Sequence, residues 1–375
     1  MALGLGAAAC GESAPAASRS SAPPKAPVRV AAPLVLTYQG GVQILDRTTL
    51  KLVQDIPLPG FNRVNAAGDG RHVLVSTADG FRLLDAAGTT LRQERFEAAK
   101  PGHVVRHAGK TVLFADGSGE VTVFDPRELG TSLPRTSTHT TEHPHHGVAV
   151  VLRDGRMVVT LGTEEKRTGV QVLDAARKEV VRNEDCPGVH GESAVKDEAV
   201  VIGCENGALV YRDGTFTKVA SPDGYGRIGN QAGHEESPIA LGDYKTDPDA
   251  ELERPTRVSL IDTRTGGLRL VDVEASYSFR SLGRGPHGEA LVLGTDGALR
   301  TIDPETGKIT ATVKVVEPWR EPMEWQEARP ALHVRDHTAY VTDPARKKVH
   351  AVDIETGKVQ VTGRLPHVPN EITTA

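Results

Sequence analysis

Four histidines lie within eight residues of the stretch HTTEHPHHG, which runs from His139 to Gly147. Histidine is the commonest side-chain ligand for metals, and its imidazole titrates near physiological pH. A run of this kind is typical of a metal site, of a tract that binds metal loosely, or of a solvated polar loop. The rest of the sequence has to distinguish these three interpretations.

Three histidines recur at a nearly constant interval. His103, His146 and His190 are separated by 43 and 44 residues, and the last two share a His-Gly pair in HHGVAV and VHGESAV. Each lies 9 to 12 residues before an apolar segment that is predicted to be the second strand of a repeating unit. Equivalent positions of adjacent units around a common axis converge, so the three imidazoles are predicted to form a metal-binding face.

The fourth ligand of this predicted site is left open. His234 follows His190 by 44 residues, but it lies only five residues before Ile239, which places it in a turn. Glu192, Glu371 or a water molecule remain as candidates. The alternative interpretation is that all these side chains are polar channel residues bonded to water.

His139, His143 and His145 lie just outside the predicted channel and are candidates for a second, more exposed metal site, with a solvated loop as the alternative.

Zinc is the predicted ion. Imidazole suits zinc, copper, iron and nickel, but no methionine or free cysteine accompanies the histidines, which argues against a copper site built on soft ligands.

A repeat explains why the histidines recur. An apolar pair, an aspartate and a short turn appear in ILDRTTL, LLDAAGTTL, VFDPREL, VLDAARKEV, LIDTRTGGL, TIDPETGKI and AVDIETGKV, and LVYRDGTF fills the remaining gap. The period of about 40 to 50 residues is typical of β-propeller blades. The aspartate is expected in a tight turn between the two outer strands, where its carboxylate can accept hydrogen bonds from backbone N–H groups.

Alternating apolar strands such as HVLVST, TVLFAD and AVVIGC precede these turns and argue for strand rather than helix. The sequence therefore predicts an all-β chain, an eight-bladed β-propeller over residues 33–375, with seven blades as the alternative. The first unit lacks an innermost strand. The segment VPNEITTA, residues 368–375, is predicted to supply it and to close the ring.

The composition and charge of the chain argue against several classes of function. The formal net charge is −5, so no basic surface for nucleic acid is expected. Aromatic residues make up 4% of the chain and there are only 3 methionines, which disfavours a sugar-binding cleft or a methionine-rich groove. We expect a monomer that contacts the membrane only through a lipid anchor.

The anchor is predicted from LGLGAAAC, where small residues run into Cys10 as at the end of a bacterial lipoprotein signal. Residues 1–10 are thus expected to be a signal remnant with Cys10 as the lipidated residue. Residues 11–32, rich in Ser, Ala and Pro, are expected to be a disordered linker. A tag-like or disordered N-terminus is the alternative, because no Lys or Arg precedes Arg19.

The other two cysteines, Cys186 and Cys204, are 18 residues apart and flank a predicted hairpin. An exported location permits a disulfide between them. Metal ligation is the weaker alternative, because the spacing matches no common zinc motif.

The repeat, HPHHGVAV, CPGVHGES and IGC together resemble the AztD-type zinc metallochaperones, from about Pro33 onward. The resemblance implies an extracytoplasmic propeller on the bacterial cell surface or in the periplasm. It further implies that the chain binds zinc and transfers it to the solute-binding protein of a zinc ABC transporter. It supports His103, His146 and His190 as ligands and Cys186 and Cys204 as a disulfide. The chain departs from the family in showing no long His/Asp-rich N-terminal arm.

Two other functions compete, because a propeller fold by itself does not determine function. One is a surface scaffold for protein–protein interaction. The other is a metal-dependent hydrolase, in which three histidines and zinc would activate a water molecule. Because no partner base stands at a fixed spacing, we expect the chain not to be an enzyme.

Overall fold

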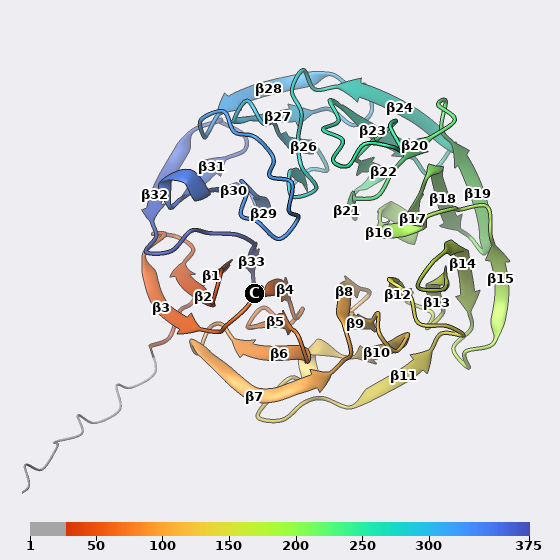
Figure 1. Ribbon diagram of the computed structural model, residues 1–375, viewed down its shortest axis with the longest axis horizontal. Helices are drawn as coiled ribbons and strands as arrows, with labels where there is room; N and C mark the ends of the chain where they lie inside the picture. Colours follow the sequence, from red (N-terminus) through yellow and green to blue (C-terminus); the bar gives the residue numbers. More distant parts are fainter. Residues whose placement is uncertain (1–27) are drawn as a thin grey trace, which may run out of the picture.

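Eight antiparallel sheets surround a central opening in the computed structural model, which describes residues 28–375 (Figure 1). Each sheet is one blade, with one edge strand toward the centre and the other edge strand at the rim. The predicted eight-bladed propeller is confirmed, and the alternative of seven blades is wrong.

The strands of the first four blades are given from the innermost to the outermost. They are β33 (Ile372–Thr374), β1 (Pro33–Tyr38), β2 (Gly41–Asp46) and β3 (Leu52–Pro57); β4 (Arg63–Ala66), β5 (His72–Thr77), β6 (Gly80–Asp85) and β7 (Thr90–Glu97); β8 (Pro101–His107), β9 (Lys110–Ala115), β10 (Glu120–Phe124) and β11 (Thr136–Thr140); and β12 (Ala149–Val151), β13 (Met157–Gly162), β14 (Arg167–Leu173) and β15 (Glu179–Asn183).

The remaining four blades follow the same order. They are β16 (His190–Ala194), β17 (Val200–Cys204), β18 (Asn206–Arg212) and β19 (Thr215–Ala220), with β20 (Gly226–Arg227) beside β18; β21 (Gln231–His234), β22 (Ser237–Gly242), β23 (Arg257–Asp262) and β24 (Gly267–Asp272); β25 (Leu282–Arg284), β26 (Ala290–Leu293), β27 (Ala298–Ile302) and β28 (Ile309–Lys314); and β29 (Leu332–Arg335), β30 (Thr338–Asp343), β31 (Lys348–Asp353) and β32 (Val359–Arg364). Three short 3₁₀ turns complete the set: η1 (Pro126–Glu128), η2 (Lys196–Glu198) and η3 (Pro344–Arg346).

The hydrophobic core lies between neighbouring blades. Phe114 of β9, Val158 of β13 and Ile202 of β17 belong to one buried cluster that extends over three sheets. All five residues of β17 are buried, whereas in the outer strand β19 exposed positions alternate with partly or fully buried ones. This pattern follows from sheets packed face to face, in which the middle strands are covered on both sides and the rim strands on one.

The recurring aspartates close the outer turns as predicted. Asp46 Oδ1 accepts hydrogen bonds from the backbone N–H groups of Thr48 and Thr49, at 3.1 and 2.8 Å. Asp303 does the same in the seventh blade, and Asp353 Oδ1 accepts from the Thr356 N–H in the eighth. The short polar side chain thereby satisfies backbone donors that the turn leaves unpaired.

The C-terminal strand closes the ring, which confirms the predicted closure. Strand β33 pairs antiparallel with β1, with Leu34 opposite Thr374 and Leu36 opposite Ile372. The first blade therefore combines the two ends of the described chain, and the C-terminus lies beside the central opening (Figure 1). Such a closure leaves neither end of the described chain as an unpaired sheet edge.

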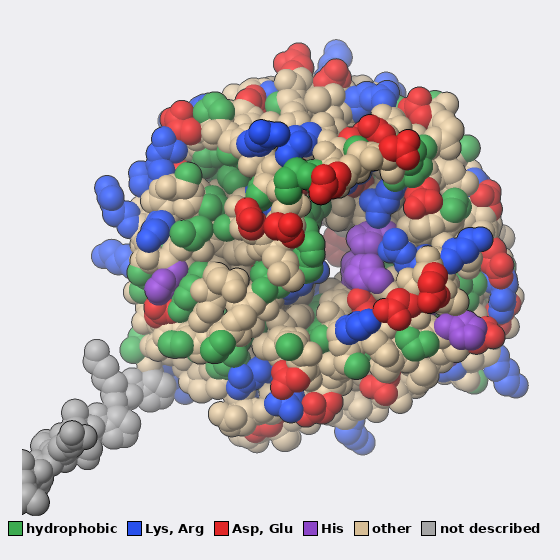
Figure 2. Space-filling model, viewed as in Figure 1, with side chains coloured by type: hydrophobic (Ala, Val, Ile, Leu, Met, Phe, Trp, Pro, Cys, Tyr) green, Lys and Arg blue, Asp and Glu red, His purple; other side chains and the backbone are tan. Residues whose placement is uncertain are grey.

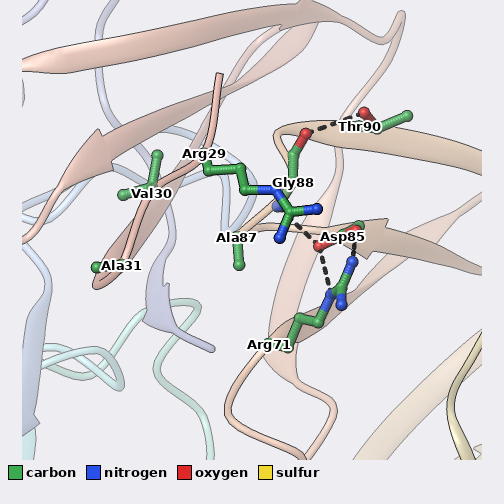
Figure 3. A pocket seen from close by; sticks show the side chains of 8 residues that line it. All are labelled: Arg29, Val30, Ala31, Arg71, Asp85, Ala87, Gly88 and Thr90. Carbon is green, nitrogen blue, oxygen red and sulfur yellow. Dashed lines mark hydrogen bonds and ion pairs between the residues drawn. The ribbon is translucent and has the colours of Figure 1, made fainter. Parts of the chain in front are cut away.

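Contacts with the propeller begin before Pro33. Val30 is only 5% exposed, its N–H donates to the Ala87 carbonyl at 2.9 Å, and the Thr89 hydroxyl donates to the Val28 carbonyl. Figure 3 shows this segment against the turn of the second blade. Residues 28–32 thus pack on the propeller, whereas the signal remnant, the rest of the predicted linker and Cys10 lie outside the described residues. Within residues 28–375, no helix has the length and apolar character needed to span a membrane.

Candidate metal centre

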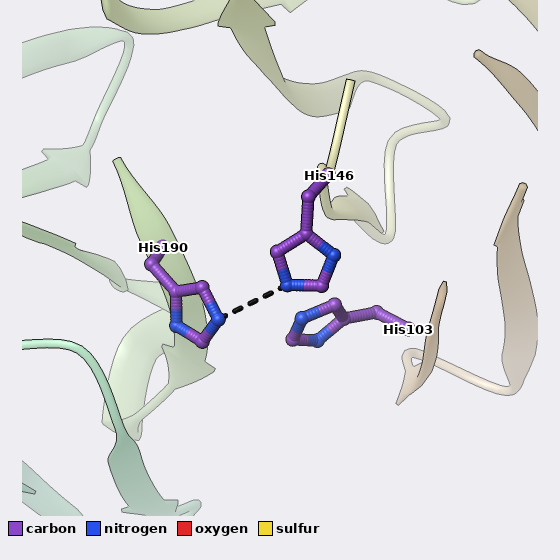
Figure 4. A group of neighbouring side chains, drawn as sticks. All are labelled: His103, His146 and His190. Atoms are coloured by element: carbon purple, nitrogen blue, oxygen red, sulfur yellow. Dashed lines mark hydrogen bonds between the residues drawn. The ribbon is translucent and has the colours of Figure 1, made fainter. Parts of the chain in front are cut away.

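The structure brings His103, His146 and His190 together at one mouth of the central opening. Each offers a ring nitrogen, and these three atoms lie within 4.8 Å of one another. The ring centroids are 5.0 to 5.5 Å apart. Figure 4 shows the rings converging from three neighbouring blades, and Figure 2 shows histidine side chains beside the central opening. We call these three residues the axial trio.

The blades position the trio through the starts of their innermost strands. His103 lies in β8, His190 begins β16, and His146 lies three residues before β12. Equivalent strand starts in consecutive blades point toward the same axis, as the 43- and 44-residue spacing predicts.

The two His-Gly pairs need glycine for different structural reasons. Gly191 has a φ of +71° and lies in a bulge where the register shifts between His190 and Glu192, which turns the His190 side chain toward the opening. A Cβ atom at Gly147 would lie 2.4 Å from the Phe114 ring. Glycine is therefore required beside both histidines, because one position needs a left-handed backbone and the other a close approach.

Hydrogen bonds determine which nitrogen of two rings carries the proton. His146 Nδ1 lies 2.5 Å from Asp116 Oδ2, and His190 Nδ1 lies 2.5 Å from the Gly229 carbonyl oxygen. A carboxylate and a carbonyl only accept, so each Nδ1 must donate and each Nε2 is left with a free lone pair in the neutral ring.

Those two Nε2 atoms face each other at 3.1 Å. Two acceptors at this distance repel unless a proton or a cation lies between them. A tetrahedral zinc ion with Zn–N bonds of about 2.0–2.1 Å separates two ligand nitrogens by about 3.3 Å, so only a small adjustment is needed. The donor set thus fits zinc. The carboxylate and carbonyl partners are the outer contacts that commonly orient metal-binding imidazoles.

Burial keeps two of the rings neutral. It lowers the pKa of His103 well below its usual value, with the neighbouring His190 and His146 adding to the effect. Burial likewise lowers the pKa of His190 to about 3, despite the opposing hydrogen bond to Gly229. Neutral imidazole is the form that binds a metal, so at neutral pH no proton has to leave these two rings before a metal binds.

The two carboxylates considered as a fourth ligand differ in their surroundings. Glu192 Oε2 lies 3.9 Å from His103 Nδ1, and burial raises the pKa of Glu192 to about 8. Glu371 is held instead by Arg63 Nε at 2.9 Å and Arg280 Nη2 at 3.2 Å. Glu192 is therefore the carboxylate beside the trio, and the Glu371 carboxylate is occupied in the ring closure.

The three histidines considered for a second site do not come together as one ligand group. His139 lies in the outer strand β11, and His143 is exposed. His145 is buried, with Nδ1 2.9 Å from the His143 carbonyl and Nε2 3.0 Å from the Thr160 hydroxyl. Both of its ring nitrogens are therefore used within the protein. The geometry does not support a zinc site in this loop, and His145 instead anchors the segment that carries His146.

Sequence reasoning missed the groups that orient the trio. Asp116 directly follows β9, at the end of a second strand in the blade next to His146. An acidic residue at that strand end was an available signal. No signal in the sequence indicated the Gly229 carbonyl, because every residue supplies a backbone oxygen.

The predicted disulfide is confirmed. Cys186 and Cys204 are bonded, and both are fully buried. The bond joins the segment before β16 to the end of β17, close to the pair formed by His190 and Gly203. It therefore ties the backbone of one axial histidine to the core of its blade.

Comparison with known proteins gives a consistent picture. No family model matches the sequence. Over 280 residues, 71% of this chain, the sequence is 27% identical to the zinc chaperone AztD of Citrobacter koseri. The match spans 64% of the length of that protein, a little under two thirds.

The solved structure of apo AztD from Citrobacter koseri superposes with a TM-score of 0.80 and 21% identity, covering 93% of this chain and 98% of that one. A second crystal structure of Citrobacter koseri AztD gives 0.78 and 21%, covering 92% and 97%. A dihydro-heme d1 dehydrogenase, NirN, solved in complex with DHE, shares the fold with a TM-score of 0.60 and 14% identity, over 91% and 74%. Together the comparisons confirm the resemblance to the AztD-type zinc chaperones that the His-Gly motifs indicate.

Proposed function

We propose that this chain is an extracytoplasmic zinc metallochaperone, which binds zinc at the axial trio and transfers it to the solute-binding protein of a zinc ABC transporter. The observation that carries the proposal is the pair of facing Nε2 atoms of His146 and His190, which lie 3.1 Å apart while the Nδ1 atom of each ring is bonded to an oxygen acceptor. The similarity to the zinc chaperone AztD supports the same function. The buried disulfide supports an oxidising compartment outside the cytoplasm.

Transfer is proposed to proceed by exchange of ligands, beginning at His146. The His146 side chain is 42% exposed, whereas that of His103 is 23% exposed. A partner that docks at this mouth of the propeller reaches His146 first. Replacing that ligand by one of its own would pass zinc on without releasing it into solution. Glu192 or a water molecule would complete the coordination.

The first test is zinc content and affinity of the purified protein beside a His103→Ala/His190→Ala variant. We expect the parent to hold zinc at the axial site and the variant to lose that ion. Equal zinc affinity of the two proteins would refute the site.

The second test is transfer. The zinc-loaded protein is mixed with a zinc-free solute-binding protein in excess chelator, and the zinc on the acceptor is measured after separation. Transfer that survives the chelator supports direct exchange, whereas transfer abolished by it shows that zinc passes through solution. We propose no catalytic role, and hydrolysis of a model ester by the zinc-loaded protein that the His103→Ala/His190→Ala variant lacks would contradict this.

A further inference from the structure

A second group of metal-ligand side chains lies far from the axial trio in the ring. His287, His337 and Glu355 each offer one ligand atom, and these atoms lie within 4.8 Å of one another. Among the described residues, this group and the axial trio are the two sets of three that meet that criterion. From this geometry we propose a second zinc site that bridges the seventh and eighth blades.

Three short turns hold the ligands. His287 lies in the turn between β25 and β26, His337 between β29 and β30, and Glu355 between β31 and β32. The axial histidines lie at or near the starts of innermost strands. Successive strands of a blade run in opposite directions, so these turns lie on the other face of the propeller. A zinc ion bound here would be separate from the axial site and would be reached from the opposite face of the propeller.

The contacts within the group match a site with two imidazoles and one carboxylate. His337 Nδ1 lies 2.7 Å from Glu355 Oε1, and His287 Nε2 lies 4.0 Å from the same oxygen. The two imidazole rings meet edge to face, with centroids 5.8 Å apart. Two histidines and a glutamate are a known zinc donor set, which leaves the fourth position to water.

Hydrogen bonds hold the backbone of the turns that carry these side chains. The Ile354 N–H donates to the His337 carbonyl at 3.0 Å, which joins two of the three turns. The His287 N–H donates to Glu289 Oε2 at 3.0 Å, and the following residue, Gly288, has a φ of +85°. Short hydrogen-bonded turns pre-organise the ligands, so zinc binding has to order only the side chains.

The side chains themselves are open to solvent, with exposed fractions of 66% for His287, 56% for His337 and 60% for Glu355. Because they are exposed, they are free to move closer together, as three bonds to one metal ion require. The same exposure leaves the bound ion in competition with water, so this site should bind zinc more weakly than the buried trio. Because its ligands come from two blades, the ion would also hold those blades together.

The test is a zinc titration of the full chain by equilibrium dialysis at neutral pH. We expect two ions per chain, the second of them weaker. A His287→Gln/His337→Gln variant should lose only the weaker ion, whereas a His103→Ala/His190→Ala variant should lose only the tighter one. Failure of the axial site and failure of this site are therefore distinguishable.

A His143→Gln variant is the matched control, because it removes another exposed histidine that belongs to neither group. It should keep both ions. An unfolding scan adds a second readout: zinc should raise the Tm of the His103→Ala/His190→Ala protein by about 2 °C and should not do so once His287 and His337 are also replaced. A single ion in the parent protein, or loss of the weaker ion in the His143→Gln variant, would overturn the proposal.

Discussion

The Nδ1 atom of His146 lies 2.5 Å from Oδ2 of Asp116, a residue of the neighbouring blade. This contact sets the tautomer of the most exposed axial histidine and aims its Nε2 at His190. A carboxylate in this position also strengthens the imidazole as a donor to zinc. The pair therefore links the packing of two blades to the orientation of the His146 ring.

Replacing Asp116 with Asn should weaken zinc binding by about 10- to 100-fold, because the amide keeps the shape but not the negative charge of the orienting partner. The measurement is competition against a zinc chelator of known affinity. Asp79→Asn is the matched control, because Asp79 occupies a similar turn in the second blade and contacts Thr77 and Arg95 instead. Equal weakening in both variants would show a general charge effect rather than a specific contact.

Glu192→Gln and Glu371→Gln should have opposite consequences. The first removes the carboxylate 3.9 Å from His103, so zinc affinity should fall while stability changes little. The second removes the partner of the buried Arg280, so stability should fall by about 3 kcal/mol while zinc affinity stays within about twofold. Chelator competition and urea unfolding of the zinc-free proteins measure the two effects. A larger loss of zinc affinity in Glu371→Gln would assign the fourth ligand to the other carboxylate.

Removing the disulfide should affect both stability and zinc binding. The bond joins residues 18 apart in sequence, and closing a loop of that size is worth about 3 kcal/mol. His190 lies four residues after Cys186 and pairs with Gly203, so its backbone should loosen when the bond is lost. A Cys186→Ala/Cys204→Ala variant should unfold at lower urea concentration and bind zinc more weakly. Unchanged zinc affinity in a destabilised protein would show that the β16–β17 pairing alone holds the ligand.

Acid should weaken the ring closure through His333. Its Nε2 accepts a hydrogen bond from the Thr374 N–H at 3.1 Å, which requires a neutral ring, and burial lowers the pKa of His333 to about 3. In the unfolded chain the pKa is about 6.5, so the unfolded state takes up the proton first. The stabilisation is therefore complete above about pH 6.5 and is lost as the pH falls from there toward about 3.

The measurement is urea unfolding of the zinc-free protein at several pH values between 7.5 and 4. His333→Gln keeps an acceptor without a titrating group, so its stability should fall less steeply, by up to about 1.4 kcal/mol per pH unit. The exposed residue His143 provides the control as His143→Gln. A parent and a His333→Gln variant with parallel pH profiles would contradict this account.

The order of the strands, the number of blades and the approach of the three histidines were all predictable from the sequence. Each depends on a pattern that repeats: alternating apolar residues, a turn aspartate about every 40 to 50 residues, and His103, His146 and His190 one blade apart. In a closed ring of similar blades, residues that are one blade apart in sequence occupy equivalent positions around the axis. The pairing of the C-terminal strand with β1 was predictable for the same reason, because the first repeat lacked an innermost strand.

The tertiary structure decided what each histidine can do. His145 and His146 are adjacent in sequence, yet one is buried with both nitrogens bonded and the other faces the opening. His287 and His337 lie 50 residues apart in equivalent turns of neighbouring blades, but Glu355 comes from a different turn, so no repeat of the sequence indicates the whole group. Hydrogen-bond partners and burial depend on side-chain packing between segments far apart in the chain. The spacing of residues specifies which strands are neighbours, but only the packed structure specifies which atoms meet.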